Sequence, residues 1–172
     1  MPTLSICIPT YNRSIYLSNT LAQLTKSDLF RNTDDVEIVV SDNCSTDDTE
    51  DVCERFRRKF GSKIVYYKQP ENIYDRNFAF SLGLASGKYA KLNNDNLFFK
   101  DGELEKFVAF LKKKTTQDLV LLAGNGCESY TCETFNDLLD KVSFSITWIG
   151  AFCVRMDAYK TLKDPDRYAG LN

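Results

Sequence analysis

The sequence predicts a single α/β domain built on a mostly parallel β-sheet with helices on both faces. Three observations support this prediction. Short runs of β-forming residues alternate with longer segments whose apolar residues recur every three or four positions. This alternation continues along the chain without an internal repeat, a linker or a low-complexity tract. The 172 residues are enough for one buried core, and strands that alternate with helices pair in parallel.

Four strands and three helices are expected in the first part of the chain. In order, they are a strand at 4–8, a helix from 14 to about 26, a strand at 36–40, a helix ending at 60, a strand at 63–68, a helix at 75–85 and a strand at 88–92. Pro9 is expected to end the first strand, since proline interrupts a sheet ladder. Ser45 and Asp48 fit a capping box at the start of the second helix, and Gly61 suits its end.

The second part is expected to add two helices and two strands. They are a helix marked by Leu104, Phe107, Val108 and Leu111, a strand at 119–123, a helix at 135–142 and a strand at 144–155. Thr134 and Asp137 occupy capping-box positions at the start of the later helix. The last strand is expected to bend at Gly150.

The composition excludes several classes of function. A formal net charge of -2 argues against nucleic-acid binding by electrostatics. The absence of histidine removes Ser-His-Asp and Cys-His nucleophilic systems. The six cysteines form no CxxC pair, so zinc fingers are excluded and reduced thiols are expected. No apolar run approaches the roughly 20 residues that span a membrane, and the N-terminus lacks the basic region of a signal peptide.

Polar side chains follow four consecutive predicted strands at the points where the strands end. The groups are Pro9–Arg13, Ser41–Asn43, Asn72 with Asp75 and Arg76, and Asn94–Asn96. Because ligands bind at the carboxyl ends of parallel strands, these groups are expected to line one site. Aromatic, acidic, amide and cationic groups together suit a nucleotide. Neither a GxGxxG fingerprint nor a P-loop is present, so a metal and cations are expected to neutralise the diphosphate.

Each of these residues has a chemical role and some have a plainer alternative. Tyr11 suits stacking on a base, or it caps the sheet. Asp42 suits an N–H group of a base, or it forms an Asx-type turn. Arg13 and Arg76 suit phosphate oxygens. Asp95 suits magnesium or manganese, although the asparagine-rich run around it also fits a plain turn.

Four segments together resemble family-2 glycosyltransferases with the GT-A (Rossmann-like) fold. They are SICIPTYNR, VVSDNCSTDDT, Asn-Ile-Tyr-Asp-Arg-Asn and GKYAKLNNDN. The resemblance covers residues 3–100 well and extends more weakly to about residue 160. Within the family, the motifs look most like those of bacterial abequosyltransferase-type and related surface-polysaccharide enzymes. Any one motif is moderately specific, whereas four in this order are strong evidence.

The resemblance implies a set of nucleotide-binding residues. They are Pro9, Thr10, Tyr11, Arg13, Asp42, Arg76 and Asn94. Tyr11 would stack on the base, which Asp42 would hydrogen-bond. Arg76 would lie near the nucleotide, and Arg13 near the phosphates.

The resemblance also implies a metal site and a division of the domain. The family's Asp-X-Asp element falls on Asn94-Asp95-Asn96, which makes Asp95 the expected ligand of a manganese or magnesium ion held with the donor diphosphate. The neighbouring amides are neutral and imply weaker or diphosphate-dependent metal binding. Residues 1–100 would form the nucleotide-sugar-binding half, and residues 101–172 the start of an incomplete acceptor-side half. The catalytic base is expected beyond Asn172, in a chain truncated at its C-terminus.

The function implied is transfer of a sugar from a UDP- or CDP-type donor to a glycan or lipid-linked acceptor in bacterial polysaccharide synthesis, with inversion. The alternative is a non-catalytic or truncated nucleotide-sugar-binding module. A nucleotidyltransferase is disfavoured because IPTYNRS contains no glycine. The expected location is the cytoplasm, with peripheral contact at the inner face of the membrane through the basic runs 55–59 and 112–114. Trp148 is expected in the core or in an acceptor pocket.

Overall fold

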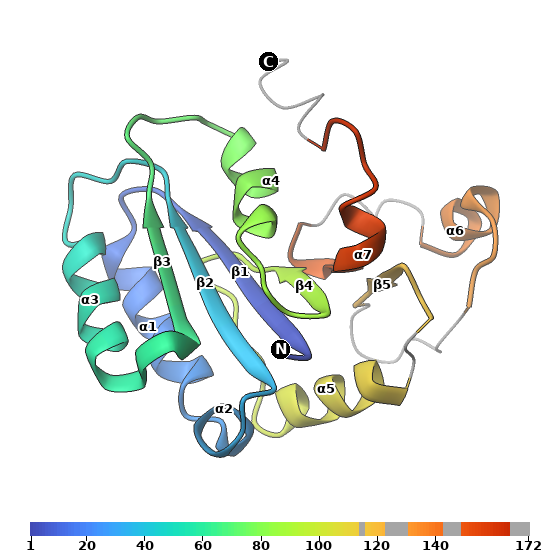
Figure 1. The fold of residues 1–172 in the computed structure, drawn as a ribbon, viewed down its shortest axis with the longest axis horizontal. Helices are drawn as coiled ribbons and strands as arrows, with labels where there is room; N and C mark the ends of the chain where they lie inside the picture. The colour runs from blue at the N-terminus through green and yellow to red at the C-terminus, as the bar shows by residue number, and fades with distance from the viewer. Residues whose placement is uncertain (114–115, 123–130, 143–148, 166–172) are drawn as a thin grey trace.

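The computed structural model describes residues 1–113, 116–122, 131–142 and 149–165, and it places a central sheet between helices (Figure 1). Six strands form the sheet in the order β3-β2-β1-β4-β6-β5. The strands are β1 (Leu4–Thr10), β2 (Val36–Asp42), β3 (Ile64–Lys68), β4 (Tyr89–Leu92), β5 (Leu119–Leu121) and β6 (Phe152–Arg155). The predicted single α/β domain is confirmed.

The pairing of the strands brings their carboxyl ends to one edge. β1 pairs in parallel with β2 and β4, and β2 pairs in parallel with β3. β6 runs antiparallel to both β4 and β5, so the sheet is mostly parallel as predicted. At the end of the ladder, Thr10 lies beside Asp42, and Asp42 lies beside Lys68. The loops that follow β1, β2 and β3 therefore leave the sheet side by side.

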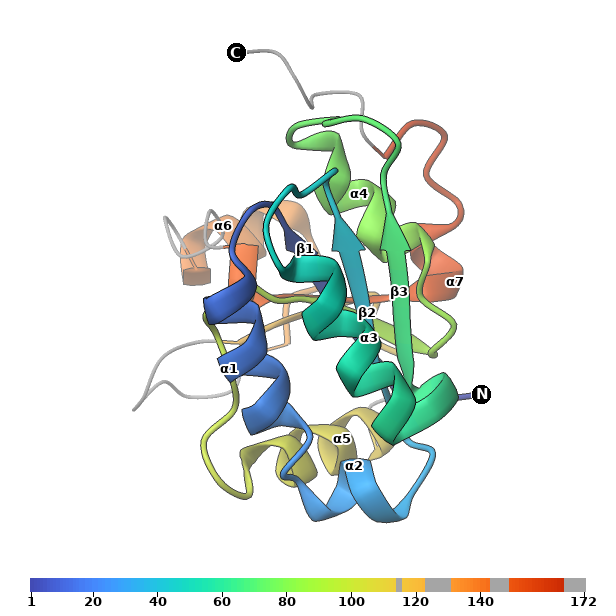
Figure 2. The same cartoon turned by 90° about the vertical axis from the view of Figure 1, so that its left-hand side faces the viewer.

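Helices cover both faces of the sheet (Figures 1 and 2). They are α1 (Ser14–Leu24), α2 (Asp28–Asn32), α3 (Thr49–Phe60), α4 (Arg76–Gly83), α5 (Glu103–Lys113), α6 (Phe135–Val142) and α7 (Met156–Tyr159), with short 3-10 turns η1 (Gly61–Lys63) and η3 (Ile149–Ala151). Side chains of α1, α2, α3 and α5 join the core cluster on one face, and those of α4 and α7 join the cluster on the other. Within the described ranges, no helix is long and apolar enough to cross a membrane.

Strand alternation explains the two core clusters. Ile6 and Ile8 of β1 pack on the α1 side, whereas Cys7 between them packs on the α4 side. All three are fully buried. Burial of each aliphatic side chain of this size contributes about 1.5–3 kcal/mol, so the sheet is held mainly from its two faces. The described cysteines are free thiols, as expected: Cys7, Cys44, Cys53, Cys132 and Cys153.

The predicted capping box at the second helix is wrong. The Ser45 hydroxyl accepts a hydrogen bond from the Asn12 N–H instead of capping α3. Asp47 takes the capping role, because its carboxylate accepts the N–H groups of both Ser14 and Thr49, the first residues of α1 and α3. These bonds, with one from the Thr49 hydroxyl, outweigh the effect of burial and lower the pKa of Asp47. At the start of α6, the predicted capping bond of Thr134 is present, since the Asp137 N–H donates to the Thr134 hydroxyl at 3.1 Å.

Several strand boundaries also differ from the prediction, and those of β1 and β6 have a structural reason. β1 continues through Pro9 to Thr10. The Cys7 carbonyl points towards β4, and an N–H at position 9, two residues further along the strand, would point the same way. The pairing of β1 with β4 ends at Cys7, so β4 needs no hydrogen bond from residue 9 and proline is tolerated there. β6 begins only at Phe152, after the 3-10 turn η3. Residues 149–151 of the predicted strand form η3 instead, and residues 144–148, which include Trp148, lie outside the described residues.

Candidate nucleotide site

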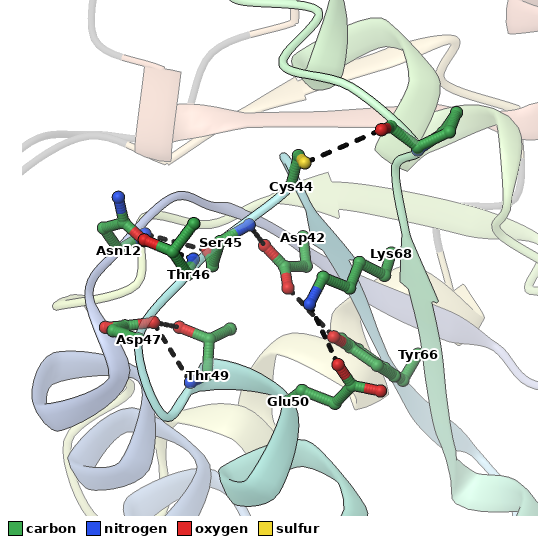
Figure 3. A network of polar contacts seen from close by, with 11 residues as sticks. Asn12, Asp42, Cys44, Ser45, Thr46, Asp47, Thr49, Glu50, Tyr66 and Lys68 are labelled. Carbon is green, nitrogen blue, oxygen red and sulfur yellow. Dashed lines mark hydrogen bonds and ion pairs between the residues drawn. The ribbon is translucent and has the colours of Figure 1, made fainter.

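The three loops beyond β1, β2 and β3 are tied to one another by hydrogen bonds. The Asn12 N–H donates to the Ser45 hydroxyl at 2.9 Å, and the Asn12 side-chain oxygen accepts the Thr46 N–H at 2.8 Å. The Asn43 N–H donates to the Thr10 carbonyl at 2.9 Å. Figure 3 shows the part of this network around Asn12, Ser45 and Thr46. The first two loops are therefore fixed relative to each other without a ligand.

Asn43 also fastens the third loop. Its side-chain oxygen accepts the Ile73 N–H at 2.8 Å. Its side-chain nitrogen donates to the Asn72 side chain at 2.7 Å and to the Tyr74 carbonyl at 3.2 Å. Asn43 is 6% exposed, so these bonds are shielded from competing water. A single buried amide thus links all three loops.

Left-handed backbone marks the same three loops. Asn12 (φ 51°), Cys44 (φ 66°) and Tyr74 (φ 53°) are the non-glycine residues with positive φ among the described residues. Each lies on a different one of the three loops, residues 11–13, 43–48 and 69–75, which we together call the rim. Such conformations cost free energy, especially for tyrosine, and they concentrate where function requires a fixed backbone. This clustering is a reason, independent of sequence motifs, to place a site here.

Asp42 lies beneath the rim instead of on its surface. It is fully buried. Its Oδ1 accepts the Ser45 N–H at 2.8 Å, and its Oδ2 accepts the Tyr66 hydroxyl at 2.9 Å (Figure 3). Burial, followed by this carboxylate, raises the pKa of Tyr66. This geometry agrees with the alternative prediction for Asp42, an Asx-type turn. A direct contact between Asp42 and a base requires the loop over Asp42 to move.

Asp95 and Arg13 form an ion pair at the edge of the rim. Arg13 Nε lies 2.8 Å from each carboxylate oxygen of Asp95, and the Thr10 hydroxyl donates to Oδ2 at 3.0 Å. The Asp95 side chain is 8% exposed, whereas that of Arg13 is 42% exposed. The Arg13 guanidinium also lies over the Tyr16 ring, 4.3 Å from its centroid. Arg13 thus neutralises a buried carboxylate while it keeps donors open to the rim.

The remaining predicted residues are distributed around this pair. Tyr11 is 45% exposed and directly precedes the left-handed Asn12. Arg76 is the exposed first residue of α4, and its guanidinium makes no ion pair within the described ranges. Pro9 is half-buried in β1. Asn94 is half-buried, and its carbonyl accepts hydrogen bonds from Asn93 Nδ2 and the Leu97 N–H.

The donor set around Asp95 does not form a complete metal site. Among the described residues, no three His, Cys, Asp or Glu side chains come together in a way that holds an ion. Both Asp95 oxygens already face Arg13, and the flanking side chains are amides. A divalent ion fits only if Asp95 gives up part of its contact with Arg13 and most other ligands come from a diphosphate and water.

Sequence reasoning missed the residues that organise the rim. Asn12 and Asn43 both lie in the predicted polar groups, but the sequence analysis predicts no structural role for either. The signal was present, since asparagine tolerates the left-handed region and bonds readily to nearby backbone. The buried Lys91 was likewise overlooked inside a predicted strand.

Comparison with known proteins identifies the family of the chain. Residues 5–149 match the model of the family described as glycosyl transferase family 2. Abequosyltransferase RfbV of Salmonella typhimurium is 39% identical over 100 residues, which cover 57% of this chain and 29% of that protein. The GalNAc(5)-diNAcBac-PP-undecaprenol beta-1,3-glucosyltransferase of Campylobacter jejuni is 31% identical over 73% of this chain and 38% of its own length. The chain therefore spans about a third of the length of these relatives.

Solved structures show the same fold. S. aureus TarS superimposes with a TM-score of 0.71 at 23% identity, over 94% of this chain and 29% of that one. A mannosyltransferase from Pyrobaculum calidifontis, in complex with GDP-Man and Mn2+, gives a TM-score of 0.70 at 14% identity, over 94% of this chain and 47% of its own. The predicted GT-A fold and the resemblance drawn from the motifs are both confirmed, and the chain belongs to glycosyl transferase family 2.

Proposed function

We propose that the rim binds the nucleoside diphosphate of a sugar donor, and that the protein transfers the sugar to a hydroxyl of a glycan or lipid-linked acceptor in bacterial polysaccharide synthesis. The observation that carries this proposal is the placement of an exposed Tyr11, an open Arg76 and the Arg13–Asp95 pair on loops fixed in advance. In a family-2 chain, this is the set of groups that a nucleotide diphosphate requires.

Tyr11 and Asp42 are the proposed base-binding residues. The exposed ring of Tyr11 offers a face on which a base can stack. Asp42 either reaches the base after the loop shifts or acts through Ser45, to which it is bonded. Pro9 and Thr10 carry Tyr11 from the end of β1 and border the ribose. A UDP- or CDP-type donor is proposed, and a solved structure of TarS is a complex with UDP-GlcNAc.

The diphosphate is proposed to lie between Arg13 and Arg76. Both guanidinium groups have free donors, and the N-terminus of α4 at Arg76 adds a favourable dipole. Asn94 borders the same space. These groups stabilise the negative charge that builds on the leaving diphosphate as the bond to the sugar breaks.

A manganese or magnesium ion is proposed to join this site together with the diphosphate. When bound, such an ion supplies further charge neutralisation of the leaving group. Asp95 would give it one carboxylate oxygen, and Arg13 would turn from Asp95 towards a phosphate oxygen. The Arg13 guanidinium already lies over the Tyr16 ring, and this cation–π contact would support the guanidinium as it turns.

Transfer with inversion requires a base that removes the proton of the acceptor hydroxyl. We propose that a carboxylate serves as this base. Reaction at the cytoplasmic face of a membrane is part of the proposal, because the Campylobacter relative is named for an undecaprenol-linked substrate. The exposed basic residues Arg55 and Arg58 of α3 would favour anionic lipid.

Calorimetric titration with UDP, CDP, TDP and GDP, each with and without manganese, tests donor binding. We expect one diphosphate to bind, and Arg76→Met to weaken that binding roughly 10- to 150-fold, as loss of one charged contact costs about 1.5–3 kcal/mol. Arg58→Met, an exposed arginine on α3, is the matched control and should bind like wild type. If none of the four binds, the donor proposal is wrong. Binding without sugar transfer to cell-derived acceptors would instead favour the non-catalytic module.

A further inference from the structure

Lys91 is a charged residue inside the sheet. It belongs to β4, is 2% exposed, and lies beside Cys153 of β6 in the antiparallel ladder. No carboxylate pairs with it among the described residues, and Nζ lies over the Phe99 ring, 5.6 Å from its centroid. An ammonium group is costly to bury, so its retention here calls for a role.

Three oxygens satisfy the Lys91 ammonium group. Nζ donates to the Leu92 carbonyl at 3.0 Å, to the Asn93 side-chain oxygen at 2.9 Å and to the Gly150 carbonyl at 2.9 Å. A protonated lysine has three N–H groups, and all three are used. The bonds fix the end of β4 and connect it to η3, the turn before β6.

The bond to Asn93 shapes the loop that carries Asp95. With its oxygen held by Lys91, Asn93 turns Nδ2 towards the Asn94 carbonyl at 2.9 Å and the Leu97 carbonyl at 2.6 Å. The Asn93 N–H donates to the Cys7 carbonyl at 2.8 Å. Asn93 thus closes the loop around Asp95 from both sides, and Lys91 sets the orientation of its amide.

We propose that Lys91 is a positioning residue that holds the Asp95 loop in its donor-binding shape and joins it to η3 in the second part of the chain. This inference rests on the proposed function, since it gives the Asp95 loop a role in donor binding. Lys91 itself does not touch the donor. It acts through Asn93.

The protonation state of Lys91 makes the proposal testable. Burial lowers the pKa of Lys91 from 10.5 to about 8. The titratable groups that face it are the thiols of Cys7 on β1 and Cys153 on β6. Burial raises the pKa of both thiols, that of Cys153 to about 12, so both are neutral when Lys91 titrates. Above pH 8 the amine loses a proton, and one of its three oxygens loses its donor.

Nuclear magnetic resonance of the ligand-free chain tests the positioning step. The side-chain amide signals of Asn93 should shift with pH with a midpoint near 8 in wild type, and they should be independent of pH in Lys91→Met. Lys100→Met, which removes an exposed lysine, should titrate like wild type. Asn93 signals that ignore pH in wild type would overturn the inference, whether or not a nucleotide binds.

Calorimetry with the diphosphate that binds tests the functional consequence. Wild-type affinity should fall about tenfold between pH 7 and 9.5, whereas Lys91→Met should bind about tenfold more weakly at pH 7 and change little with pH. Lys91→Met removes a costly buried charge but leaves three oxygens without their donor, so the affinities are compared at a temperature at which thermal unfolding shows both proteins to be folded. Equal affinities of wild type and Lys91→Met at pH 7 would refute the role. Failure of wild type to bind any diphosphate would instead refute the proposed function.

Discussion

The first part of the chain, residues 1–100, differs from the described residues of the second part, which begins at residue 101, in how its elements are held together. Beyond β1, β2 and β3, the loops are bonded to one another through Asn12 and Asn43. In the part of the sheet that the structure describes, β6 pairs with β4 over three residue pairs, whereas β5 pairs only with β6. α6 leaves Leu139 40% exposed. The groups proposed to bind the donor therefore sit on backbone that is fixed before a ligand arrives.

This difference matches two different tasks. A rigid rim avoids the entropy cost of ordering loops when a nucleotide binds. The second part joins the first in two places: β6 pairs with β4, where Lys91 bonds to η3, and α5 packs into the core cluster beside α1, α2 and α3. Changes in the rim should therefore alter donor binding, whereas changes in α6 should not.

The largest effect is expected from Asp95→Asn. The amide keeps the shape of the side chain and can still accept from Thr10, but it loses the charge that holds Arg13 and a metal. We expect the affinity for the metal–diphosphate complex to fall by about 3 kcal/mol, roughly 100-fold. Calorimetry with manganese measures this, and Asp101→Asn, an exposed carboxylate, is the matched control. If manganese strengthens diphosphate binding to Asp95→Asn as much as it does to wild type, Asp95 is not part of the metal site.

The next largest effect is expected on stability, from Gly87→Ala. A Cβ at Gly87 would lie 2.7 Å from the Ser5 hydroxyl and 2.9 Å from the Ser5 backbone nitrogen. Since that backbone belongs to β1, the start of β4 must move, at a cost of about 1–3 kcal/mol. Urea unfolding measures the change. Gly83→Ala is the control, because its Cβ meets nothing within 4 Å and alanine favours the helix.

A buried thiol should make stability depend on pH. Burial, followed by Asp42, raises the pKa of Cys53 above its ordinary value of 9.0. The unfolded chain then releases this proton at lower pH than the folded chain does, so the stability that the neutral thiol contributes is present below pH 9 and is lost above it. We expect a decline of about 1 kcal/mol per pH unit from this group. Cys53→Ala should be less stable at pH 7 but should decline less steeply between pH 9 and 10, and an equally steep decline would contradict the assignment.

Tyr11 distinguishes base stacking from capping of the sheet. If its ring stacks on the base, Tyr11→Ala should lose about 1 kcal/mol of binding free energy, and Tyr11→Phe should lose almost none. Stability should stay the same, because the side chain is 45% exposed. If Tyr11 only caps the sheet, the alanine variant should lose stability and keep its affinity. Calorimetry and thermal unfolding of the same samples separate the two.

The sequence predicted most of the first part of the fold because each element there has a strong local pattern. VEIVV is rich in β-branched residues that favour a buried strand, and Gly61 ends α3 at a φ of 62° and a ψ of -136°, a conformation that favours glycine. The short α2 was missed because a helix of five residues shows no periodicity. The late start of β6 was missed because local sequence does not determine where an antiparallel partner ends.

The candidate site was located from the sequence, but its internal bonds were not. Strand order placed Tyr11, Arg13, Arg76 and Asp95 at one edge. The pairing of Arg13 with Asp95 joins residues 82 positions apart, and local patterns carry no information on such a contact. The burial of Asp42 beneath Ser45 likewise depends on the conformation of its loop.

The smallest effect is expected in α6, from Leu139→Gln. Leu139 is 40% exposed, so the substitution should change stability by no more than about 0.5 kcal/mol and leave diphosphate affinity unchanged. Leu21→Ala in α1 is the contrasting variant from the first part, since Leu21 is fully buried and its truncation should cost about 2–5 kcal/mol. Urea unfolding and calorimetry measure both variants. A large loss of stability in Leu139→Gln would show that α6 is packed as tightly as the core of the first part, and the contrast between the two parts would then fail.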